Sequence, residues 1–378
     1  MLLTEEQGLI RETARDFARD RLSPHAADWD QTATFPAEQV REMGGLGLLG
    51  MLVDPDWDGA GADHVSYALA MSEIAGGDGG CSTIVSVQNL TCCCVQGYGS
   101  DDQKERFLEP MARGEMLGAF CLTEPQSGSD AGAIRTTAER RGNHYILNGT
   151  KQFITSGANA DVAIVFAATD IAAGKKGISA FLVPTDTPGF TVASVEKKMG
   201  QRSSDTAQLI FDDVEVTPDL MLGEEGQGYR IALGNLETGR IGIAAQAVGM
   251  AEAAFSAART YARERVTFGK PIAEHQAVAF RLADMATGVE TARQMVLHAA
   301  NCRDAGLSSL TEASMAKLYA SETAERVCSD AIQIHGGNGY IEGFPVERIY
   351  RDVRVCQIYE GTSDIQRLVI SRAILEDG

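Results

Sequence analysis

The chain has 378 residues, of which 44% are hydrophobic and 22% charged, so its length and composition are typical of a globular protein with two or three domains. Its formal net charge of −19 opposes binding to nucleic acid or to an anionic membrane surface, and neither is expected as a partner. No apolar run predicts a membrane span, and the acid-rich amphipathic N-terminus lacks the pattern of a signal or transit peptide.

Eight cysteines are scattered along the sequence without a CxxC pair or a Cys/His cluster, so no metal site is predicted. Such scatter suggests reduced thiols in a cytosol-like compartment. We expect the bacterial type of cytoplasm or, if a transit peptide has been removed, the mitochondrial matrix. The run Cys92–Cys94 is interpreted as small apolar residues of a helix rather than as a redox or metal site.

Residues 1–115 have helical periodicity and are predicted to form an N-terminal helical domain. Helices are expected over about 5–22, 36–49 and 101–115, the last interrupted at Pro110. The segment GLGLLG (45–50) matches the dinucleotide pattern GxGxxG. However, a helical pattern precedes it where that motif requires a strand, so the glycines are predicted to end a helix.

Residues 116–225 contain short β-branched and aromatic runs between turn residues, which predicts a middle β-domain with an antiparallel sheet or barrel. Asn148-Gly149 lies between two such runs and predicts a hairpin. Further strands are expected in VAIVFAAT, GISAFLVP, FTVASVE and AQLIFDDVEV. The loop within 120–136 offers hydroxyls and N–H groups for a polar ring or phosphate, although composition alone favours a plain loop.

Residues 226–378 return to long helical patterns and predict a C-terminal helical bundle domain. The fold class is therefore mainly α with a central β-domain. Ser363 and Gln366 have the spacing of a capping box at the start of the last helix. Glu360, in YEGTSD, precedes that helix, and is either a reacting carboxylate or an acid that suits the helix dipole.

Six segments together resemble the acyl-CoA dehydrogenase family over essentially the whole chain. They are LTEPQSGSDAG, NGTKQFITSGANAD, TGRIGIAAQAVGMAEAAF, YARERVTFGKPIAEHQA, QIHGGNGY and YEGTSDIQRLVISR. The resemblance implies an N-terminal helical domain, a middle β-barrel-like domain and a C-terminal four-helix bundle, in agreement with the periodicity. It also implies non-covalently bound FAD and a homotetramer built as a dimer of dimers.

The resemblance also implies the site, residue by residue. The flavin ring should meet Phe120, Leu122, Thr123, Phe153, Ile154 and Thr155. The pyrophosphate and adenosine should meet Arg265, Phe268 and Gln276 of one subunit and Gln333, Gly336 and Gly337 of another, and Thr362 and Asp364 should also touch FAD. Ser129 should lie beside the cofactor and contact the thioester, while Glu237, Thr238, Gly239, Arg240 and Gly361 border the substrate channel. Many members have tryptophan where this chain has Phe153.

The reaction implied is α,β-dehydrogenation of an acyl-CoA to the trans-2-enoyl-CoA, in fatty acid or branched-chain amino acid catabolism. Glu360 removes the α-proton and flavin N5 accepts the β-hydride. The developing enolate oxygen requires hydrogen bonds, which a ribityl hydroxyl and the N–H of Glu360 supply. Some members carry the base at the position of Gly239, which has no side chain to act. Electrons then pass to an electron-transfer flavoprotein, and LETGRIG favours a short or branched short acyl chain.

Three alternatives stay open. An acyl-CoA oxidase would be much longer in most cases. A dehydrogenase of carrier-protein-bound acyl thioesters would use the same base. A catalytically silent flavoprotein scaffold is disfavoured by the intact Glu360.

Overall fold

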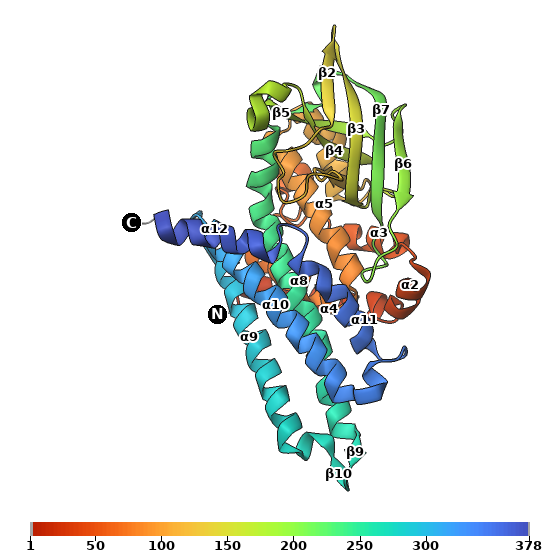
Figure 1. Cartoon of the computed structure of the whole chain (residues 1–378), viewed down its shortest axis with the longest axis vertical. Coiled ribbons are helices and arrows are strands. Elements are labelled where there is room, and N and C mark those ends of the chain that lie inside the picture. Colours follow the sequence, from red (N-terminus) through yellow and green to blue (C-terminus); the bar gives the residue numbers. More distant parts are fainter. Residues whose placement is uncertain (1–2, 377–378) are drawn as a thin grey trace.

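The computed structural model describes residues 3–376, and its sheet lies at one end of the molecule, beside helices from both the N-terminal and the C-terminal part of the chain (Figure 1). The fold class predicted from the sequence, mainly α with a central β-domain, is confirmed. The N-terminal group of helices contains α1 (Glu5–Phe17), α2 (Ala26–Thr32), α3 (Ala37–Gly45), α4 (His64–Gly77), α5 (Gly79–Tyr98), α6 (Asp101–Gln103) and α7 (Glu109–Ala112). Both α4 and α5 are buried on nearly every side, as their apolar composition requires.

Two details of the N-terminal helices agree with the sequence reasoning. Helix α3 ends at Gly45 and a turn follows, so GLGLLG does not join a strand to a helix. A π-helical segment, Lys104–Leu108, joins α6 to α7, and Pro110 lies in the first turn of α7. The missing N–H of proline is tolerated there because a first-turn N–H has no partner within the helix.

The middle of the chain forms a mixed sheet. Its strands are β1 (Gly118–Cys121), β2 (Thr137–Arg141), β3 (His144–Thr155), β4 (Val162–Ala168), β5 (Ile178–Pro184), β6 (Phe190–Val195), β7 (Thr206–Val216) and β8 (Met221–Leu222). The order is β6-β7-β3-β2-β4-β5-β8, with β1 paired to β4. Most pairs are antiparallel, but β1 and β2 lie parallel to β4.

The hairpin predicted at Asn148-Gly149 is wrong. Strand β3 continues through both residues with a register irregularity against β7, and the reversal occurs instead at Gly142, between β2 and β3. Gly149 is required for a different reason: a Cβ there would lie 2.4 Å from the hydroxyl of Thr136. Close approach of a neighbouring segment therefore explains this glycine better than a turn does.

The C-terminal group contains α8 (Gly228–Glu264), α9 (Gln276–Asp304), α10 (Leu310–His335), α11 (Pro345–Val353) and α12 (Ser363–Glu376). Helix α8 extends from the sheet to the opposite end of the molecule, where the short hairpin of β9 (Val266–Thr267) and β10 (Lys270–Pro271) leads into α9 (Figure 1). One hydrophobic core joins α1, α4 and α5 to α8, α9, α10 and α11, so the two helical groups pack as one body.

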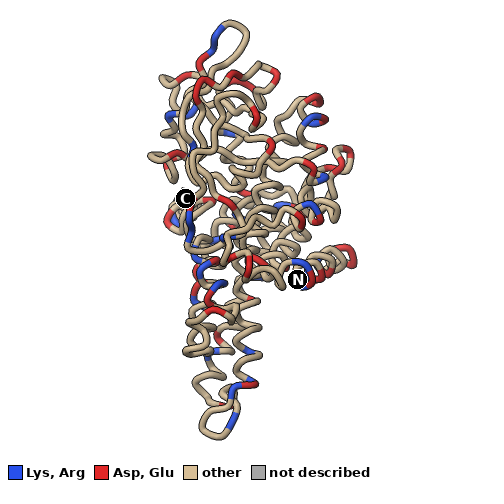
Figure 2. The backbone as a smooth tube through the Cα atoms, turned by 90° about the vertical axis from the view of Figure 1, so that its right-hand side faces the viewer, with Lys and Arg blue, Asp and Glu red and all other residues tan. Residues whose placement is uncertain are grey.

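Among the described residues, α8 alone is long and apolar enough to cross a membrane by length and composition, a property that the sequence reading missed. Its most apolar window is 72% buried inside the protein, as is usual for a core helix. Acidic and basic residues are interspersed along the chain (Figure 2).

Candidate active site

Glu360 lies in the loop between a 3-10 turn (Arg354–Gln357) and α12, and its carboxylate faces α8. A Cβ built on Gly239 of α8 would lie 2.8 Å from the Oε2 atom of Glu360. That oxygen is buried and has no hydrogen-bond partner among the described residues. Gly239 thus provides the space that this carboxylate occupies, and the two positions at which the family carries its base converge in space.

Burial raises the pKa of Glu360 above its ordinary value, while the positive charges of Lys317 and Arg240 act in the opposite direction. If Glu360 only interacted with the dipole of α12, its carboxylate would be expected in solvent. A buried carboxylate with an unused oxygen and a raised pKa is instead typical of a general base.

The cap of α12 differs from the prediction. The hydroxyl of Thr362 accepts the N–H of Ile365 at 3.2 Å, whereas the hydroxyl of Ser363 is buried without a described partner. Gln366 does reach back, but its Nε2 donates to the carbonyl oxygens of Gly361 (2.9 Å) and Glu360 (3.3 Å). The predicted Ser363/Gln366 capping box is wrong because the helix begins at Ser363 and Thr362 takes the cap position.

The predicted substrate residues on α8 surround Gly239. Arg240 is buried, with Nη1 3.5 Å from the hydroxyl of Ser314 and with no described partner for Nε. Burial lowers its pKa, against the attraction of Glu360 and Glu237. Glu237 accepts the N–H of Ser309 at 3.2 Å and lies 3.6 Å from Arg303, so it binds the start of α10. Thr238 is also buried, and Gly361 directly follows the base.

The two segments predicted to meet the flavin ring lie together. Gln152 donates its backbone N–H to the carbonyl oxygen of Thr123 at 2.9 Å, and Lys151 Nζ contacts the carbonyl oxygen of Leu122 at 3.2 Å. The buried Lys151 also pairs with Glu124 at 2.7 Å. Four of the residues predicted to meet the flavin ring have exposed surface: Phe153 is 62% exposed, and Phe120, Thr123 and Thr155 are partly exposed. Leu122 and Ile154 are buried.

A loop of residues 201–205 connects these segments to the loop of Glu360. Asp205 accepts the N–H of Ser156 through its carbonyl oxygen at 3.3 Å. Gln201 donates its backbone N–H to Asp352 and its Nε2 to the hydroxyl of Tyr359 at 3.3 Å. Continuous contacts thus lead from β3 to the residue before the base. Ser129 lies exposed in the loop after Glu124, and Asp364 lies on α12, 3.4 Å from Arg367.

The other predicted cofactor residues lie at the far end of the bundle. Arg265, Phe268 and Gln276 follow the C-terminus of α8, and Gln333, Gly336 and Gly337 end α10 beside them. Tyr261 of α8 stacks on His335 at 4.3 Å and accepts a hydrogen bond from Asn338 at 3.0 Å. By helix rise, Arg265 is about 39 Å from Gly239. Within one chain, this group does not meet Glu360.

Three of the predicted site residues have a strained backbone conformation. Glu360 (φ 54°), Phe153 (φ 58°) and Phe268 (φ 51°) are in the left-handed region, although none is glycine. Such backbone is costly for residues with a side chain and is concentrated at functional sites.

Profiles of the N-terminal, middle and C-terminal domains of acyl-CoA dehydrogenases match residues 4–115, 119–214 and 226–375. The chain belongs to the acyl-CoA dehydrogenase family. An acyl-CoA dehydrogenase of Bacillus subtilis is 49% identical over 376 residues, 99% of both chains. The human mitochondrial short-chain specific acyl-CoA dehydrogenase is 48% identical over 374 residues, 99% of this chain and 91% of that protein.

Two solved structures extend the comparison. Butyryl-CoA dehydrogenase from Megasphaera elsdenii has a TM-score of 0.97 and 42% identity, with 99% of each chain covered. A chain in the structure described as the electron transferring flavoprotein of Acidaminococcus fermentans has a TM-score of 0.98 and 43% identity, with 100% of each chain covered.

Acyl-CoA dehydrogenases are FAD-dependent oxidoreductases, and the residues present fit this cofactor. Phe153 exposes an apolar ring at an irregularity of β3, and Thr123 and Thr155 are partly exposed on the two segments that lie together there. Exposed Phe268 and the guanidinium of Arg265 suit an adenosine and a diphosphate. No group of three or more possible metal ligands occurs in the described residues, and burial raises the pKa values of Cys92, Cys93 and Cys94.

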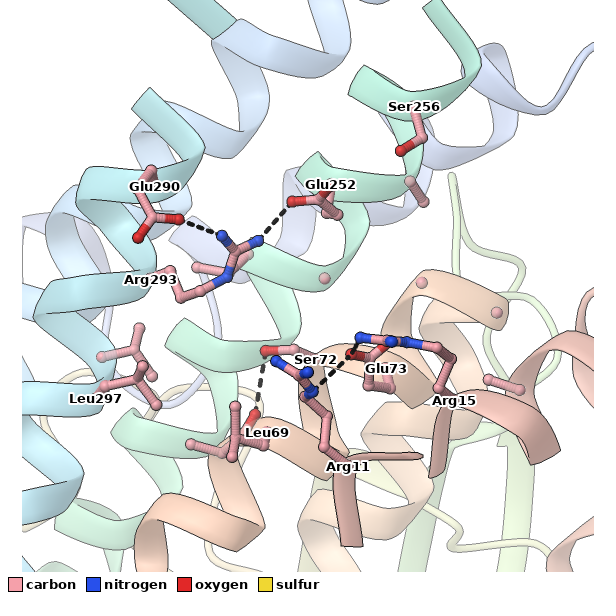
Figure 3. A pocket seen from close by; sticks show the side chains of 18 of the residues that line it. Arg11, Arg15, Leu69, Ser72, Glu73, Glu252, Ser256, Glu290, Arg293 and Leu297 are labelled. Carbon is pink, nitrogen blue, oxygen red and sulfur yellow. Dashed lines mark hydrogen bonds and ion pairs between the residues drawn. The ribbon is translucent and has the colours of Figure 1, made fainter. Parts of the chain in front are cut away.

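A cleft of about 990 Å³ opens elsewhere, between α1, α4, α8 and α9 (Figure 3). Arg15 pairs there with Glu73 at 2.7 Å, and Arg293 lies between Glu252 and Glu290. None of the predicted site residues lines this cleft, and its charges are largely paired within the acyl-CoA dehydrogenase chain itself.

Lys317 is the residue near the base that the sequence reasoning missed. Its Nζ donates to the carbonyl oxygens of Tyr359 (2.7 Å) and Gly361. A signal was present: Lys317 lies in the same helical row as the buried Ala313, Ala320 and Ala324, where a solvated lysine is not expected.

Proposed function

We propose that this acyl-CoA dehydrogenase oxidises a short-chain acyl-CoA to the trans-2-enoyl-CoA, with Glu360 as the base that removes the α-proton. The observation that carries the proposal is the buried Oε2 of Glu360, which has no described hydrogen-bond partner and faces Gly239. A carboxylate with an unused oxygen is free to accept a proton.

The residues around Glu360 support this role. A base must be deprotonated to act, and the positive charges of Lys317 and Arg240 favour the carboxylate form against burial. FAD, when bound, supplies the acceptor for the β-hydride. The backbone N–H of Glu360 donates to the thioester oxygen as negative charge develops there. Substrate binding excludes more water and raises the pKa of Glu360 further, toward the pH at which the enzyme works.

A short acyl chain is supported by a contact beyond the base. Tyr67 of α4 is buried, and a Cβ on Gly242 would lie 2.5 Å from its hydroxyl oxygen. Gly242 is three residues after Gly239, on the same face of α8. The ring of Tyr67 therefore fills space close to the base. The short-chain relative and the butyryl-CoA dehydrogenase point to the same class of substrate.

We also propose the partners. Residues at the far end of the bundle, Arg265, Phe268, Gln276, Gln333, Gly336 and Gly337, approach the FAD of neighbouring copies in a homotetramer, because they lie too far from the flavin segments of their own chain. An electron-transfer flavoprotein accepts the electrons, as the related Acidaminococcus fermentans structure suggests. A cytoplasmic location is in keeping with bacterial relatives.

The test is Glu360→Gln, which keeps the shape of the side chain and removes its basicity. The variant should fold and bind FAD, yet bleach the flavin about 10²–10⁴-fold more slowly with butyryl-CoA under anaerobic conditions. Glu322→Gln is the control, since the carboxylate of Glu322 on α10 is paired with Arg367 of α12. Bleaching by Glu360→Gln at the rate of this control would overturn the assignment, and a panel from four to sixteen acyl carbons would test the chain length.

A further inference from the structure

Lys317 is a lysine buried inside the bundle, with 1% of its surface exposed. Its hydrogen-bond acceptors are two backbone carbonyl oxygens, those of Tyr359 (2.7 Å) and Gly361. These are the residues immediately before and after Glu360. An ammonium group has three donors and no acceptor, so it is well suited to hold two carbonyl oxygens at once.

The backbone that Lys317 holds is strained. Glu360 has φ 54° and Gly361 has φ 87°. For a residue with a Cβ, the left-handed conformation is unfavourable and persists only where the surroundings enforce it. This conformation turns the carboxylate of Glu360 toward Gly239 while the preceding and following carbonyl groups face α10.

A second side chain completes the arrangement. Gln366 of α12 donates its Nε2 to the carbonyl oxygens of Gly361 at 2.9 Å and Glu360 at 3.3 Å. Lys317 and Gln366 therefore bind three successive carbonyl groups from two different helices. The base is fixed through its main chain, and its side-chain oxygen remains available for chemistry.

The charges near the base come from several elements. Lys317 of α10 and Arg240 of α8 are the cations that lower the pKa of Glu360. Tyr67 of α4 and Cys94 of α5 are also close enough to feel the charge of Glu360, but burial raises their pKa values and keeps them neutral. Burial lowers the pKa of Lys317 to about 8, against the raising effect of Glu360 and Cys356, with Arg240 lowering it further.

We propose that Lys317 is a positioning residue for the dehydrogenation, whose buried ammonium fixes the strained backbone of Glu360 and provides a positive charge beside its carboxylate. This inference rests on the proposed role of Glu360 as the base. The two contributions are separable, because an amide can replace some of the hydrogen bonds of the ammonium but not its charge.

Two variants test the two contributions. Lys317→Gln removes the charge and keeps a donor, so the acid limb of the pH profile for flavin reduction should move up by on the order of one pH unit. Lys317→Met removes both, and its rate at high pH should also fall at least tenfold. Ser321→Ala, a buried change one turn further along α10, is the control for packing and should keep the wild-type acid limb.

A measurement independent of turnover uses a double-mutant cycle on unfolding. Lys317→Met should lower the denaturation midpoint less in the Glu360→Gln background than in the wild type, because the neutral side chain has no charge to compensate. Additive effects, with an unmoved acid limb in both Lys317 variants, would refute the positioning role. If Lys317→Met does not fold, Lys317→Gln still decides through its pH profile. An active Glu360→Gln would instead refute the base itself.

Discussion

Replacing Gly239 by alanine separates the stability of α8 from the placement of the base. The new Cβ would lie 2.8 Å from Oε2 and 3.3 Å from Cδ of Glu360. Ordinary contact begins near 3.4 Å, so the carboxylate must move by about 0.6 Å. It is the end of a flexible side chain, so the movement itself is cheap. Alanine also favours a helix over glycine by about 0.5–1 kcal/mol.

We therefore expect Gly239→Ala to keep or raise the free energy of unfolding while slowing flavin reduction by butyryl-CoA about tenfold. The estimate scales a hundredfold loss for a misplacement of 1 Å to the smaller displacement here. Thermal denaturation and anaerobic stopped-flow absorbance give the two quantities.

The matched control is Gly234→Ala, on the same helix. A Cβ at Gly234 would meet only the hydroxyl of Tyr98 at 3.7 Å, an ordinary contact. This variant should gain the same helix propensity and keep the wild-type rate. Equal rates for the two variants would mean that the carboxylate does not work from the position over Gly239. A large loss of stability in Gly239→Ala alone would mean that the side chain of Glu360 is not free to move.

Three further predictions concern the rest of the fold. Burial, with Asp78 beside it, raises the pKa of Asp352 to about 7, so its contribution to stability is full below pH 4 and is lost as the pH rises toward 7. Between pH 4 and 7, the free energy of unfolding of the wild type in urea should fall by up to about 1.4 kcal/mol per pH unit because of Asp352, and Asp352→Asn should not show this fall. Parallel pH profiles of the two proteins would contradict the prediction. Native Cys92–Cys94 should react slowly with a thiol reagent at pH 8, because burial raises all three pKa values; rapid reaction of all three would show that α5 is not buried. Gly149→Ala should lower the melting temperature clearly, since Thr136 occupies the space of the new Cβ, and an unchanged melting temperature would refute that contact.

Much of the fold followed from periodicity. The apolar spacing of SDIQRLVISRAILE predicts the last helix over 363–376, and the structure has it as Ser363–Glu376, shortly after Gly361. The error at Asn148-Gly149 has a physical cause. A glycine after asparagine permits a turn, but it equally permits close packing, and only the approach of Thr136 decides between them.

The cap of α12 shows a similar limit. Serine and threonine are both favoured at the cap of a helix, so Thr362 and Ser363 are equally good candidates from the sequence. Ser363 precedes Gln366 by three residues, and Thr362 precedes Ile365 by three, so spacing fits either choice. The choice depends on where the chain leaves its left-handed turn at Glu360 and Gly361, which is a property of the loop and of the two side chains that hold it. Spacing alone does not contain this information.

The strained residues show that the sequence can identify site residues without predicting their backbone conformation. Glu360, Phe153 and Phe268 were identified through resemblance, yet nothing in their side chains predicts a positive φ. Each is held by other parts of the chain: Glu360 by Lys317 and Gln366, and Phe153 by the irregular register of β3 with β7. Phe268 is held locally, in the two-residue turn between the paired strands β9 and β10. For Glu360 and Phe153, local strain is offset by contacts formed elsewhere in the fold. A residue whose conformation costs free energy on its own must be supported by its partners. Substitutions at partners such as Lys317 should therefore change flavin reduction although their own side chains do not react.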